Sequence, residues 1–392
     1  MAEFYRLQNR AKHYEWGSPG FIPDLLGFPR DGKPYAELWM GSHPGSPSLV
    51  ELPGGAVGLG EFIGGNLPYL LKLLAAESPL SIQAHPTLEQ ARKGFARENG
   101  AGLAPDAPDR SYRDSNHKPE VVCALTPFTG MCGFRAPAEI AELVGTFLGE
   151  NPPAVLREGF APLLNALESP AEESALRNFL AALFGIPPAM RGALTEFILT
   201  QRRANERDGC EWELMRSFAG QYPGDPAVVA PLYLNVFRLK PGEAVFLKAG
   251  VLHAYVRGFA VELMASSDNV LRGGLTPKHI DVPELMRVLD FAPLKPKIMR
   301  PEPGVSSFTY PTPCDDFSLT VMRGTGNTAE LPLNGPSICV VTAGEGIIGR
   351  EVLRKGESIF VPPAASWEKP LTLRGVYTLH IASTGNPSAN AQ

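Results

Sequence analysis

The stretch "KPGEAVFLKAGVLH", residues 240–253, decides the fold because its pattern occurs twice in the chain. A turn that contains Gly242 leads into an apolar run, and a second loop follows. The run "RKGESIFVPPAASW", residues 354–367, has the same order. Three positions correspond in the two runs: Gly242 and Gly356, Glu243 and Glu357, and Phe246 and Phe360. The repeat predicts one strand–turn–strand unit of a jelly roll that is used twice, although coincidence is an alternative for so short a match.

The two copies end differently. The first ends in His253, whereas the second has Trp367 at the matching position. Imidazole is a common metal ligand and indole is not. If the copies are duplicated barrels, only the first keeps a ligand-type residue there.

The length and composition of the chain favour a mainly β protein with several domains. Its 392 residues exceed what one ordinary core accommodates, so two or three domains are expected. The 40 glycines and 39 prolines place many turns between short apolar runs.

Charge and cysteine content set the expected surroundings of the protein. A net charge of -5 gives no reason to expect nucleic acid or an anionic membrane as a partner. The first residues lack the apolar core of a signal peptide, and no apolar run approaches the length of a membrane span. The five cysteines include no CxxC pair. We therefore expect a cytoplasmic protein with reduced, mostly buried thiols.

Residues 137–225 interrupt the β pattern. In "APAEIAELVGTFLG", residues 136–149, the apolar residues have the spacing of an amphipathic helix. Further helical segments are predicted at residues 172–184, 189–207 and 211–222. Residues 137–225 thus form a helical insert domain inside a discontinuous β barrel of residues 1–136 and 226–300. Residues 301–392 form a C-terminal jelly-roll domain without metal ligands.

Three separate strands each offer a polar pair on one face, because side chains two apart on a strand share a face. The pairs are Gln83 and His85, Lys118 and Glu120, and His253 and Tyr255. Two imidazoles and a carboxylate suit a zinc-like ion, and a site without cysteine is more typical of catalysis than of structure. The alternative is three unrelated wet strand faces, since sequence alone does not show that they meet.

Several other charged residues lie in a context that suits a substrate site. Asp268, Arg272 and Lys278 occur among turn residues after a strand that carries Glu262. A solvated hairpin loop explains them equally well. Lys72, flanked by leucines, either reaches along apolar surface to solvent or enters a cavity and holds an anion.

The motifs of several common enzyme classes are absent from the sequence. It contains no P-loop, no GxGxxG after a strand, no GxSxG and no HExxH. This argues against nucleotide hydrolysis, dinucleotide chemistry, serine hydrolysis and proteolysis of the HExxH type.

Seven runs of the sequence resemble the type I phosphomannose isomerase family. They are "YEWG" (14–17), "AELWMGSHP" (36–44), "LPYLLKLL" (67–74), "LSIQAHP" (80–86), "YRDSNHKPE" (112–120), "LNVFRLKPGEA" (234–244) and "HAYVRGFAVELMASSDNVLRGGLTPK" (253–278). "NHKPE" and the run from His253 are the most specific. The resemblance covers about residues 14 to 285, and the last hundred residues match only as a generic jelly roll.

The resemblance implies cupin-type β barrels with an inserted helical domain, and one zinc ion per chain. It implies that the zinc ligands are Gln83, His85, Glu120 and His253. It assigns Arg272 to catalysis. The pocket residues that it implies are Trp16, Lys72, Ser81, Lys118, Tyr255, Glu262, Asp268 and Lys278. It also implies a monomer that acts on a sugar phosphate.

The implied reaction interconverts mannose 6-phosphate and fructose 6-phosphate and supplies mannose and GDP-mannose metabolism. One proton moves between C2 and C1 through an enediolate, for which zinc supplies an electrophile. Arg272 stays protonated, so we interpret it as a charge clamp. Glu262 is our candidate base, with zinc-linked water or a histidine as alternatives. Lys72, Ser81 and Lys118 are candidates to bind the phosphate.

One position departs from the family pattern, and two other functions compete with the implied one. The family usually has Arg-Ala-Gly where this chain has Arg272, Gly273 and Gly274. The extra glycine is expected to loosen a loop by roughly 0.5–1 kcal/mol of backbone entropy without removing a functional group. The competing functions are a non-catalytic sugar- or metal-binding cupin and a metal-dependent cupin oxygenase.

Overall fold

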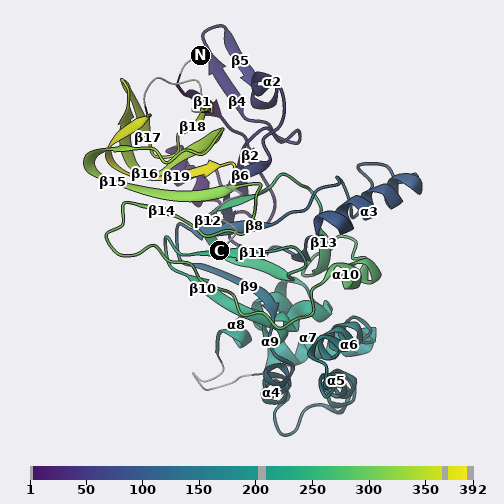
Figure 1. Cartoon of the computed structure of the whole chain (residues 1–392). Helices are drawn as coiled ribbons and strands as arrows, with labels where there is room; N and C mark the ends of the chain where they lie inside the picture. Colours follow the sequence, from purple (N-terminus) through teal and green to yellow (C-terminus); the bar gives the residue numbers. More distant parts are fainter. Residues whose placement is uncertain (1–2, 202–208, 364–369, 386–392) are drawn as a thin grey trace.

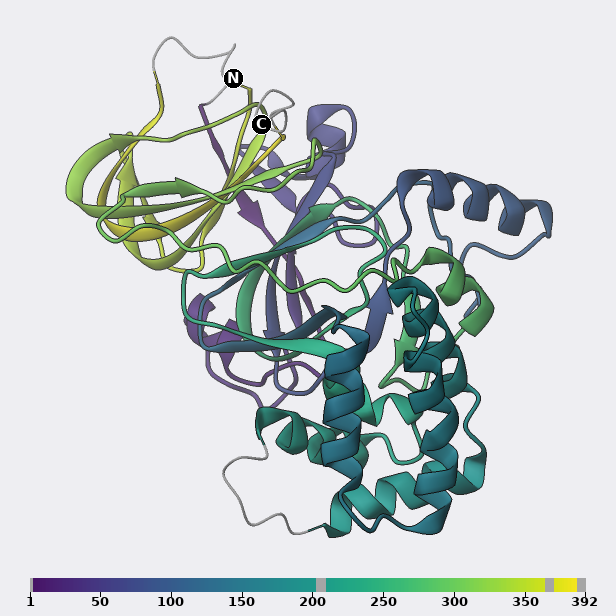
Figure 2. The same cartoon turned by 60° about the horizontal axis from the view of Figure 1, so that its bottom comes forward.

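The computed structural model describes residues 3–201, 209–363 and 370–385. Figures 1 and 2 show helices gathered at one end, the C-terminal strands at the other, and a β body between them. All pairings between the named strands are antiparallel. The prediction of a mainly β protein with helices is therefore confirmed.

The sheet in the middle of the molecule carries the candidate site. Ten strands form it within the described residues. They are β2 (Ala11–Lys12), β3 (Glu37–Met40), β6 (Tyr69–Ala76), β7 (Ile82–Ala84), β8 (Glu120–Ala124), β9 (Phe128–Phe134), β10 (Leu234–Leu239), β11 (Ala244–Leu247), β12 (His253–Ala265) and β13 (Leu271–Gly274).

β12 organises this sheet because it pairs with four other strands. Its second half, residues 258–265, pairs with β6, and part of that half also pairs with β8. Its first residues pair with β7 and β9, with a register shift between Tyr255 and Arg257. All of its residues except Arg257 are buried, as expected for a strand covered on both faces. This one strand therefore fixes the positions of β6, β7 and β8, which carry most of the candidate site.

A second sheet combines both ends of the chain. Its nine strands, counted over the described ranges, come from residues 5–58 and 307–383. They are β1 (Tyr5–Gln8), β4 (Leu49–Leu52), β5 (Gly55–Gly58), β14 (Ser307–Thr309), β15 (Ser318–Glu330), β16 (Ser337–Ile348), β17 (Glu351–Arg354), β18 (Ser358–Val361) and β19 (Thr372–Ser383). β1 joins the two halves by pairing with β4 on one side and β18 on the other. Part of the segment 1–136 thus pairs with the C-terminal strands, and the predicted domain boundaries stay a prediction.

An apolar layer joins the two sheets. One buried cluster contains Leu71 and Val121 from the middle sheet together with Ile338 and Phe360 from the second. Burying such side chains stabilises the arrangement by about 25 cal/mol per Å² of apolar surface. The second sheet therefore packs directly behind the strands that carry the candidate site.

The helices between β9 and β10 include the region predicted to be helical, 137–225, and continue beyond it to Tyr233. They are α4 (Pro137–Leu148), α5 (Ala154–Leu167), α6 (Glu172–Phe184), α7 (Pro188–Thr200), α8 (Gly209–Gln221), the 3₁₀ helix η2 (Pro226–Val229) and α9 (Ala230–Tyr233). Their apolar faces share a core with side chains of the middle sheet such as Met131 and Ala254. The remaining helices are α1 (Phe21–Leu26), α2 (Leu59–Ile63), α3 (Leu88–Gly100) and α10 (Val282–Val288).

Two details of the helical block differ from the sequence prediction. The helix predicted at 189–207 ends at Thr200, because Gln201 adopts an extended backbone with ψ of 118°. The predicted residues 202–207 lie outside the described part of the chain. α5 was not predicted, since Pro162 interrupts its pattern, yet Leu156, Phe160 and Leu163 are buried on one face.

The two copies of the sequence repeat have the same local structure. In the first, Lys240 N–H donates to Glu243 Oε2 over 2.9 Å, and in the second Arg354 N–H donates to Glu357 Oε2 over 2.8 Å. The intervening glycines have similar positive φ values, 86° at Gly242 and 90° at Gly356. Each turn leads into a strand, β11 or β18. The aligned Trp367 lies outside the described residues.

The cysteine and membrane predictions are consistent with the described residues. Cys123, Cys132, Cys314 and Cys339 are free and buried. In the same ranges, none of the helices combines the length and the apolar character that a membrane crossing requires.

Candidate metal centre and adjoining cavity

His85, Glu120 and His253 form a buried cluster that can hold a metal ion. Their potential ligand atoms all lie within 4.8 Å of one another. His85 Nε2 is 3.4 Å from Glu120 Oε2, and His253 Nε2 is 3.2 Å from Glu120 Oε1. The three residues follow β7, begin β8 and begin β12. The strand-face argument from the sequence thus brought together side chains that do meet.

Strand pairing places the predicted ligands Gln83 and His253 side by side. Gln83 of β7 is paired directly with His253 of β12, and on its other side with Arg272 of β13. Glu120 of β8 is paired with Met264 near the other end of β12. Directly paired residues have Cβ atoms only about 4.5–5.5 Å apart. The fourth predicted ligand, Gln83, is therefore beside His253, on the wall of the adjoining cavity.

Hydrogen bonds orient both imidazoles for metal binding. His85 Nδ1 is 2.7 Å from the carbonyl oxygen of Asn269, and His253 Nδ1 is 2.9 Å from that of Val251. A carbonyl accepts only, so each Nδ1 carries a proton and donates it. With Nδ1 as the donor, each ring turns its Nε2 toward Glu120, which is the usual arrangement of a metal-ligating histidine. Burial and the nearby ammonium of Lys118 lower the pKa of His85 to about 4, which keeps this ring neutral.

Unpartnered buried atoms show that the residues fit a metal ion. Glu120 Oε2 and His253 Nε2 are buried and have no hydrogen-bond partner among the described residues. Lys118 Nζ, 3.2 Å from Glu120 Oε2 and 3.3 Å from His85 Nε2, offsets part of the negative charge. Although burial raises the pKa of Glu120, the nearby ammonium of Lys118 holds it well below the ordinary value. Lone pairs that face one another across a small buried space favour a cation between them.

Tyr255 supports the carboxylate of this cluster. Its hydroxyl donates to Glu120 Oε1 over 2.7 Å, and the residue is 1% exposed. Burial, followed by the nearby carboxylates Glu120 and Glu262, raises the pKa of Tyr255 well above its ordinary value. Tyr255 therefore stays a donor that fixes the orientation of Glu120.

A cavity of about 830 Å³ adjoins the cluster. Its volume suits a small organic ligand. Its lining contains these predicted residues: Trp16, Lys72, Ser81, Gln83, Lys118, Glu262, Asp268, Arg272 and Lys278. Site residues predicted from five separate runs of the sequence thus line a single cavity.

Lys72 lies in the cavity wall between two carboxylates. Its Nζ is 3.0 Å from Glu262 Oε2 and 3.3 Å from Glu37 Oε1, and all three side chains are less than a tenth exposed. Burial opposes the charge on Lys72, but Glu262 and Glu37 outweigh it and raise its pKa. Burial also raises the pKa of Glu262, against the opposing effect of Lys72. The lysine enters the cavity rather than reaching solvent, which resolves the alternatives left by the sequence.

Arg272 and Lys278 differ from the paired lysines. Neither side chain forms an ion pair with another described residue, and both line the cavity. Burial, with the charge of Arg113, lowers the pKa of Arg272 below its ordinary value. Burial also lowers the pKa of Lys278, with Arg272 and Arg113 as further causes. This end of the cavity is consequently positive and open to an anion.

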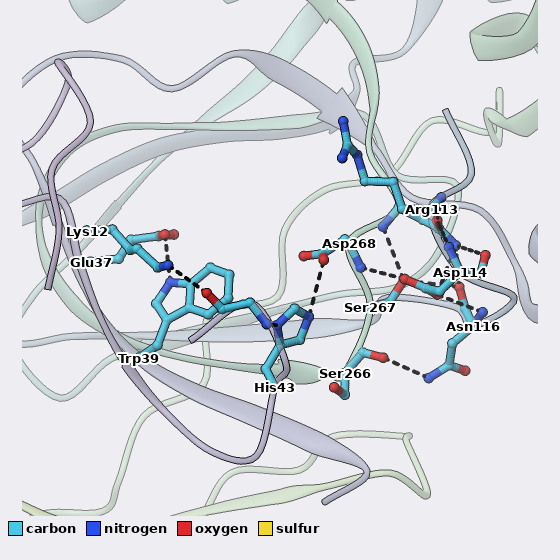
Figure 3. Close-up of polar contacts among 12 residues, drawn as sticks. Lys12, Glu37, Trp39, His43, Arg113, Asp114, Asn116, Ser266, Ser267 and Asp268 are labelled. Carbon is cyan, nitrogen blue, oxygen red and sulfur yellow. Dashed lines mark hydrogen bonds and ion pairs between the residues drawn. The ribbon is translucent and has the colours of Figure 1, made fainter. Parts of the chain in front are cut away.

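Two residues of "AELWMGSHP" that were not chosen from the sequence belong to the same wall. Glu37 accepts a hydrogen bond from Trp39 Nε1 over 2.8 Å, besides its contact with Lys72. His43 Nε2 is 3.3 Å from Asp268 Oδ2. Figure 3 shows Glu37 against Trp39 and the His43 ring turned toward Asp268. The two-residue spacing of Glu37 and Trp39 was the only available signal for this wall, and nothing in the sequence distinguished His43.

Several known proteins are similar to this chain in sequence and in fold. A family model described as "Phosphomannose isomerase type I, catalytic domain" matches residues 4–53 and 54–137. The mannose-6-phosphate isomerase of Escherichia coli K12 is 36% identical, over 94% of this chain and 97% of that protein. The human mannose-6-phosphate isomerase is 34% identical, over 94% of this chain and 95% of that protein.

Two solved structures extend the comparison. One is a zinc-bound holo mannose 6-phosphate isomerase, with a TM-score of 0.86 at 34% identity. The other is the enzyme of Salmonella typhimurium bound to fructose 6-phosphate and zinc, again with a TM-score of 0.86 at 34% identity. In both cases the match covers 98% of this chain and all of the solved one.

Proposed function

Because the chain belongs to the type I phosphomannose isomerase family, we propose that it interconverts mannose 6-phosphate and fructose 6-phosphate. One observation carries the proposal. The buried cluster of His85, Glu120 and His253 adjoins a cavity lined by a buried carboxylate, Glu262, and by Arg272, whose guanidinium has no ion-pair partner among the described residues. The two β units are taken as cupin-type barrels, and residues 137–225 as a helical domain inserted in the first.

The metal of this site is proposed to be zinc. His85, Glu120 and His253 would hold it, with the amide oxygen of Gln83 as a fourth ligand. Two imidazoles and one carboxylate are typical of catalytic zinc sites. Bound there, zinc would supply a Lewis acid that polarises a substrate oxygen. Tyr255 and Asn269 hold Glu120 and His85 in place through the hydrogen bonds described above.

Glu262 is the proposed base for the transfer of a proton between C2 and C1. A base must lie close to its substrate, and a raised pKa makes a carboxylate a stronger proton acceptor. Burial raises the pKa of Glu262, while Lys72 at 3.0 Å acts in the opposite direction and favours the ionised form. Lys72 thus limits the rise in the pKa of Glu262. It also places a positive charge beside the enediolate that forms.

The positive end of the cavity suits the anionic part of the substrate. The charges of Lys72 and Lys118 are balanced by nearby carboxylates, whereas Arg272 and Lys278 have no acidic partner among the described residues. We therefore assign Lys278 to the phosphate, with Ser81 on the same cavity wall. Arg272 clamps negative charge between the phosphate and the reacting oxygens.

Turnover of mannose 6-phosphate tests the proposed function. The protein is assayed for fructose 6-phosphate as purified, after chelation with EDTA, and after zinc is restored. We expect activity that chelation removes and zinc returns. The same assay with unphosphorylated mannose measures how far the positive end contributes. An enzyme that is fully loaded with zinc and makes no product would refute the proposal.

Solvent labelling tests the route of the proton. The reaction is run in deuterated water and the product is analysed for deuterium at C1. Proton transfer through a carboxylate that exchanges with solvent predicts labelled product. Complete absence of label would exclude an exchanging Glu262 and favour a hydride shift or a shielded base.

A further inference from the structure

His43 lies against the cavity wall without lining the cavity. It follows β3 and is 6% exposed. Its ring stands perpendicular to that of Trp39, with 5.1 Å between the centroids. Trp39 does line the cavity. The ring of His43 is thus fixed one layer behind the surface that a ligand would contact.

Hydrogen bonds determine where the proton of His43 lies. The backbone N–H of Gly45 donates to Nδ1 over 3.1 Å, so Nδ1 must present a lone pair. The proton of the neutral ring is then on Nε2, which faces Asp268 Oδ2 at 3.3 Å. His85 and His253 have the opposite arrangement, with the proton on Nδ1. His43 therefore donates a hydrogen bond from Nε2, whereas His85 and His253 present an Nε2 lone pair that can bind a metal ion.

The backbone that carries Asp268 is anchored from the other side. Asp268 N–H donates to Asp114 Oδ2 over 2.7 Å, and Ser267 Oγ donates to Asp114 Oδ1 over 2.8 Å. Figure 3 shows this cluster of contacts on one side of Asp268 and His43 on the other. These bonds fix the main chain but leave rotation of the Asp268 carboxylate free. Only His43 Nε2 contacts its oxygens among the described residues.

We propose that His43 is a positioning residue that acts through Asp268. The His43 donor holds Oδ2, and the Asp268 side chain lines the cavity and is 46% exposed, which leaves Oδ1 available to a ligand there. A carboxylate fixed in this way accepts a hydrogen bond from a sugar hydroxyl in one orientation. A freely rotating carboxylate would instead lose rotational entropy on substrate binding or in the transition state. The inference rests on the proposed function, because it takes a sugar phosphate as the occupant of the cavity.

The charges around Asp268 fit an ionised acceptor. Burial tends to raise its pKa, but the hydrogen bond from His43 and the charges of Lys72 and Lys118 outweigh burial and lower it. Lys72 and Lys118 are balanced by their own carboxylates. Asp268 therefore depends on His43 for its one direct donor.

A set of four variants tests the proposal by turnover of zinc-loaded enzyme. His43→Phe keeps a ring against Trp39 and removes the donor, whereas His43→Gln places an amide donor at nearly the same reach. Asp268→Asn and the double variant His43→Phe/Asp268→Asn complete a double-mutant cycle. We expect His43→Phe to lower kcat about tenfold with KM changed less than threefold, and His43→Gln to recover most of the loss. The double variant should be no slower than Asp268→Asn alone.

Three results would overturn the inference: His43→Phe at wild-type kcat, His43→Gln as slow as His43→Phe, or losses that add in the double variant. Equal thermal midpoints and zinc contents show that the variants are folded.

Inactivity of the wild-type protein would refute the proposed function instead. The inference is then decided by carbon-13 titration of Asp268, assigned with Asp268→Asn. Its pKa should rise in His43→Phe and stay in place in His43→Gln, and an unchanged value in both would contradict the proposal.

Discussion

Lys72 and Glu262 are paired directly across β6 and β12, and Lys72 Nζ lies 3.0 Å from Glu262 Oε2. The pair is buried, and Glu37 adds a second carboxylate 3.3 Å from the same ammonium. Two carboxylates therefore share one positive charge, which is an unequal balance for a buried site. Glu262 has the raised pKa that such an arrangement produces, with burial as the largest cause. The fold thus keeps a carboxylate with a raised pKa beside the candidate metal centre.

The first prediction concerns Glu262 as a base. Glu262→Gln keeps the shape of the side chain and removes its ability to take up a proton. A positioned general base contributes about 10²–10⁴-fold, so we expect kcat to fall by at least about a hundredfold. Zinc content should not change, because Glu262 is not in the cluster of His85, Glu120 and His253. Glu37→Gln is the matched control, since it removes the other carboxylate beside Lys72 and should cost less. A kcat within threefold of wild type for Glu262→Gln would exclude this role.

The second prediction concerns Gln83 as a metal ligand. The residue lies beside His253 on the cavity wall. Loss of a supporting group typically weakens metal binding by about 10–100-fold. We expect that loss for Gln83→Ala, measured as zinc affinity in competition with a chelator. Ser81→Ala, on the same wall, should keep wild-type affinity while weakening substrate binding. If Gln83→Ala retains full affinity, three protein ligands suffice.

Strand alternation selected the residues of the metal cluster as candidates, and the structure shows that His85, Glu120 and His253 meet. Gln83 and His85, and likewise Glu120, were found because each is one of a pair two residues apart on a strand. Glu37 has the same spacing from Trp39, but its contact with Lys72 depends on the pairing of β3 with β6. That register is a long-range property which no local pattern reveals. The contacts of Glu37 with Lys72 and of His43 with Asp268 therefore became visible only in the structure.

The helical block shows the same distinction between local and long-range information. α6 coincides with its predicted range, because its spacing and its ends are set locally. α5 has an interior proline, yet its buried face packs into the shared core, so tertiary contacts override the weak propensity. The pairing of β1 with β18 joins residues more than 340 positions apart and has no signal in either segment.

The third prediction separates function from stability at Arg272. This side chain is half-buried and has no ion-pair partner in the described ranges, and burial lowers its pKa. An unpaired cation that loses solvent destabilises a fold. Arg272→Met should therefore leave the thermal midpoint unchanged or raise it, while kcat/KM falls by about a hundredfold or more. Comparison with Lys248→Met, which breaks the exposed ion pair to Asp290, controls for loss of a surface charge. A clear drop in the midpoint of Arg272→Met would show that this residue serves the fold.

The fourth prediction compares two neighbouring glycines. Gly273 lies within strand β13, not in a loop, so the expected loosening of a loop does not describe its place in the fold. A Cβ at Gly273 would meet only side-chain tips, Leu285 Cδ2 at 3.2 Å and Leu252 Cδ1 at 3.3 Å. Gly273→Ala should therefore change stability by less than about 1 kcal/mol. Gly274 has a φ of 137°, and a Cβ there would lie 2.1 Å from Ala227 Cβ. Gly274→Ala should lower stability by roughly 2 kcal/mol or more, measured by chemical denaturation. Equal effects of the two changes would contradict this placement of β13.

The fifth prediction concerns acid stability and uses His380 of β19 in the second sheet. Burial, with the charge of Arg323, lowers the pKa of His380 to about 3. In the unfolded chain a histidine has a pKa of about 6.5, so between these values the unfolded state binds one more proton. The stabilisation associated with neutral His380 is present above pH 6.5 and is lost as the pH falls toward 3. The slope from this one group is at most about 1.4 kcal/mol per pH unit.

His380→Gln removes this proton uptake and keeps hydrogen-bonding capacity toward Thr342, which lies 3.1 Å from the imidazole. The free energy of unfolding is measured by denaturant titration at several pH values between 4.5 and 6.5. We expect the variant to be less stable at neutral pH but to lose stability less steeply as the pH falls. The comparison uses the slope of the free energy of unfolding against pH. The free energy at any one pH is less informative, because it also contains the cost of repacking around the new side chain. Parallel slopes in the two proteins would show that His380 is protonated in the folded state as readily as in the unfolded one.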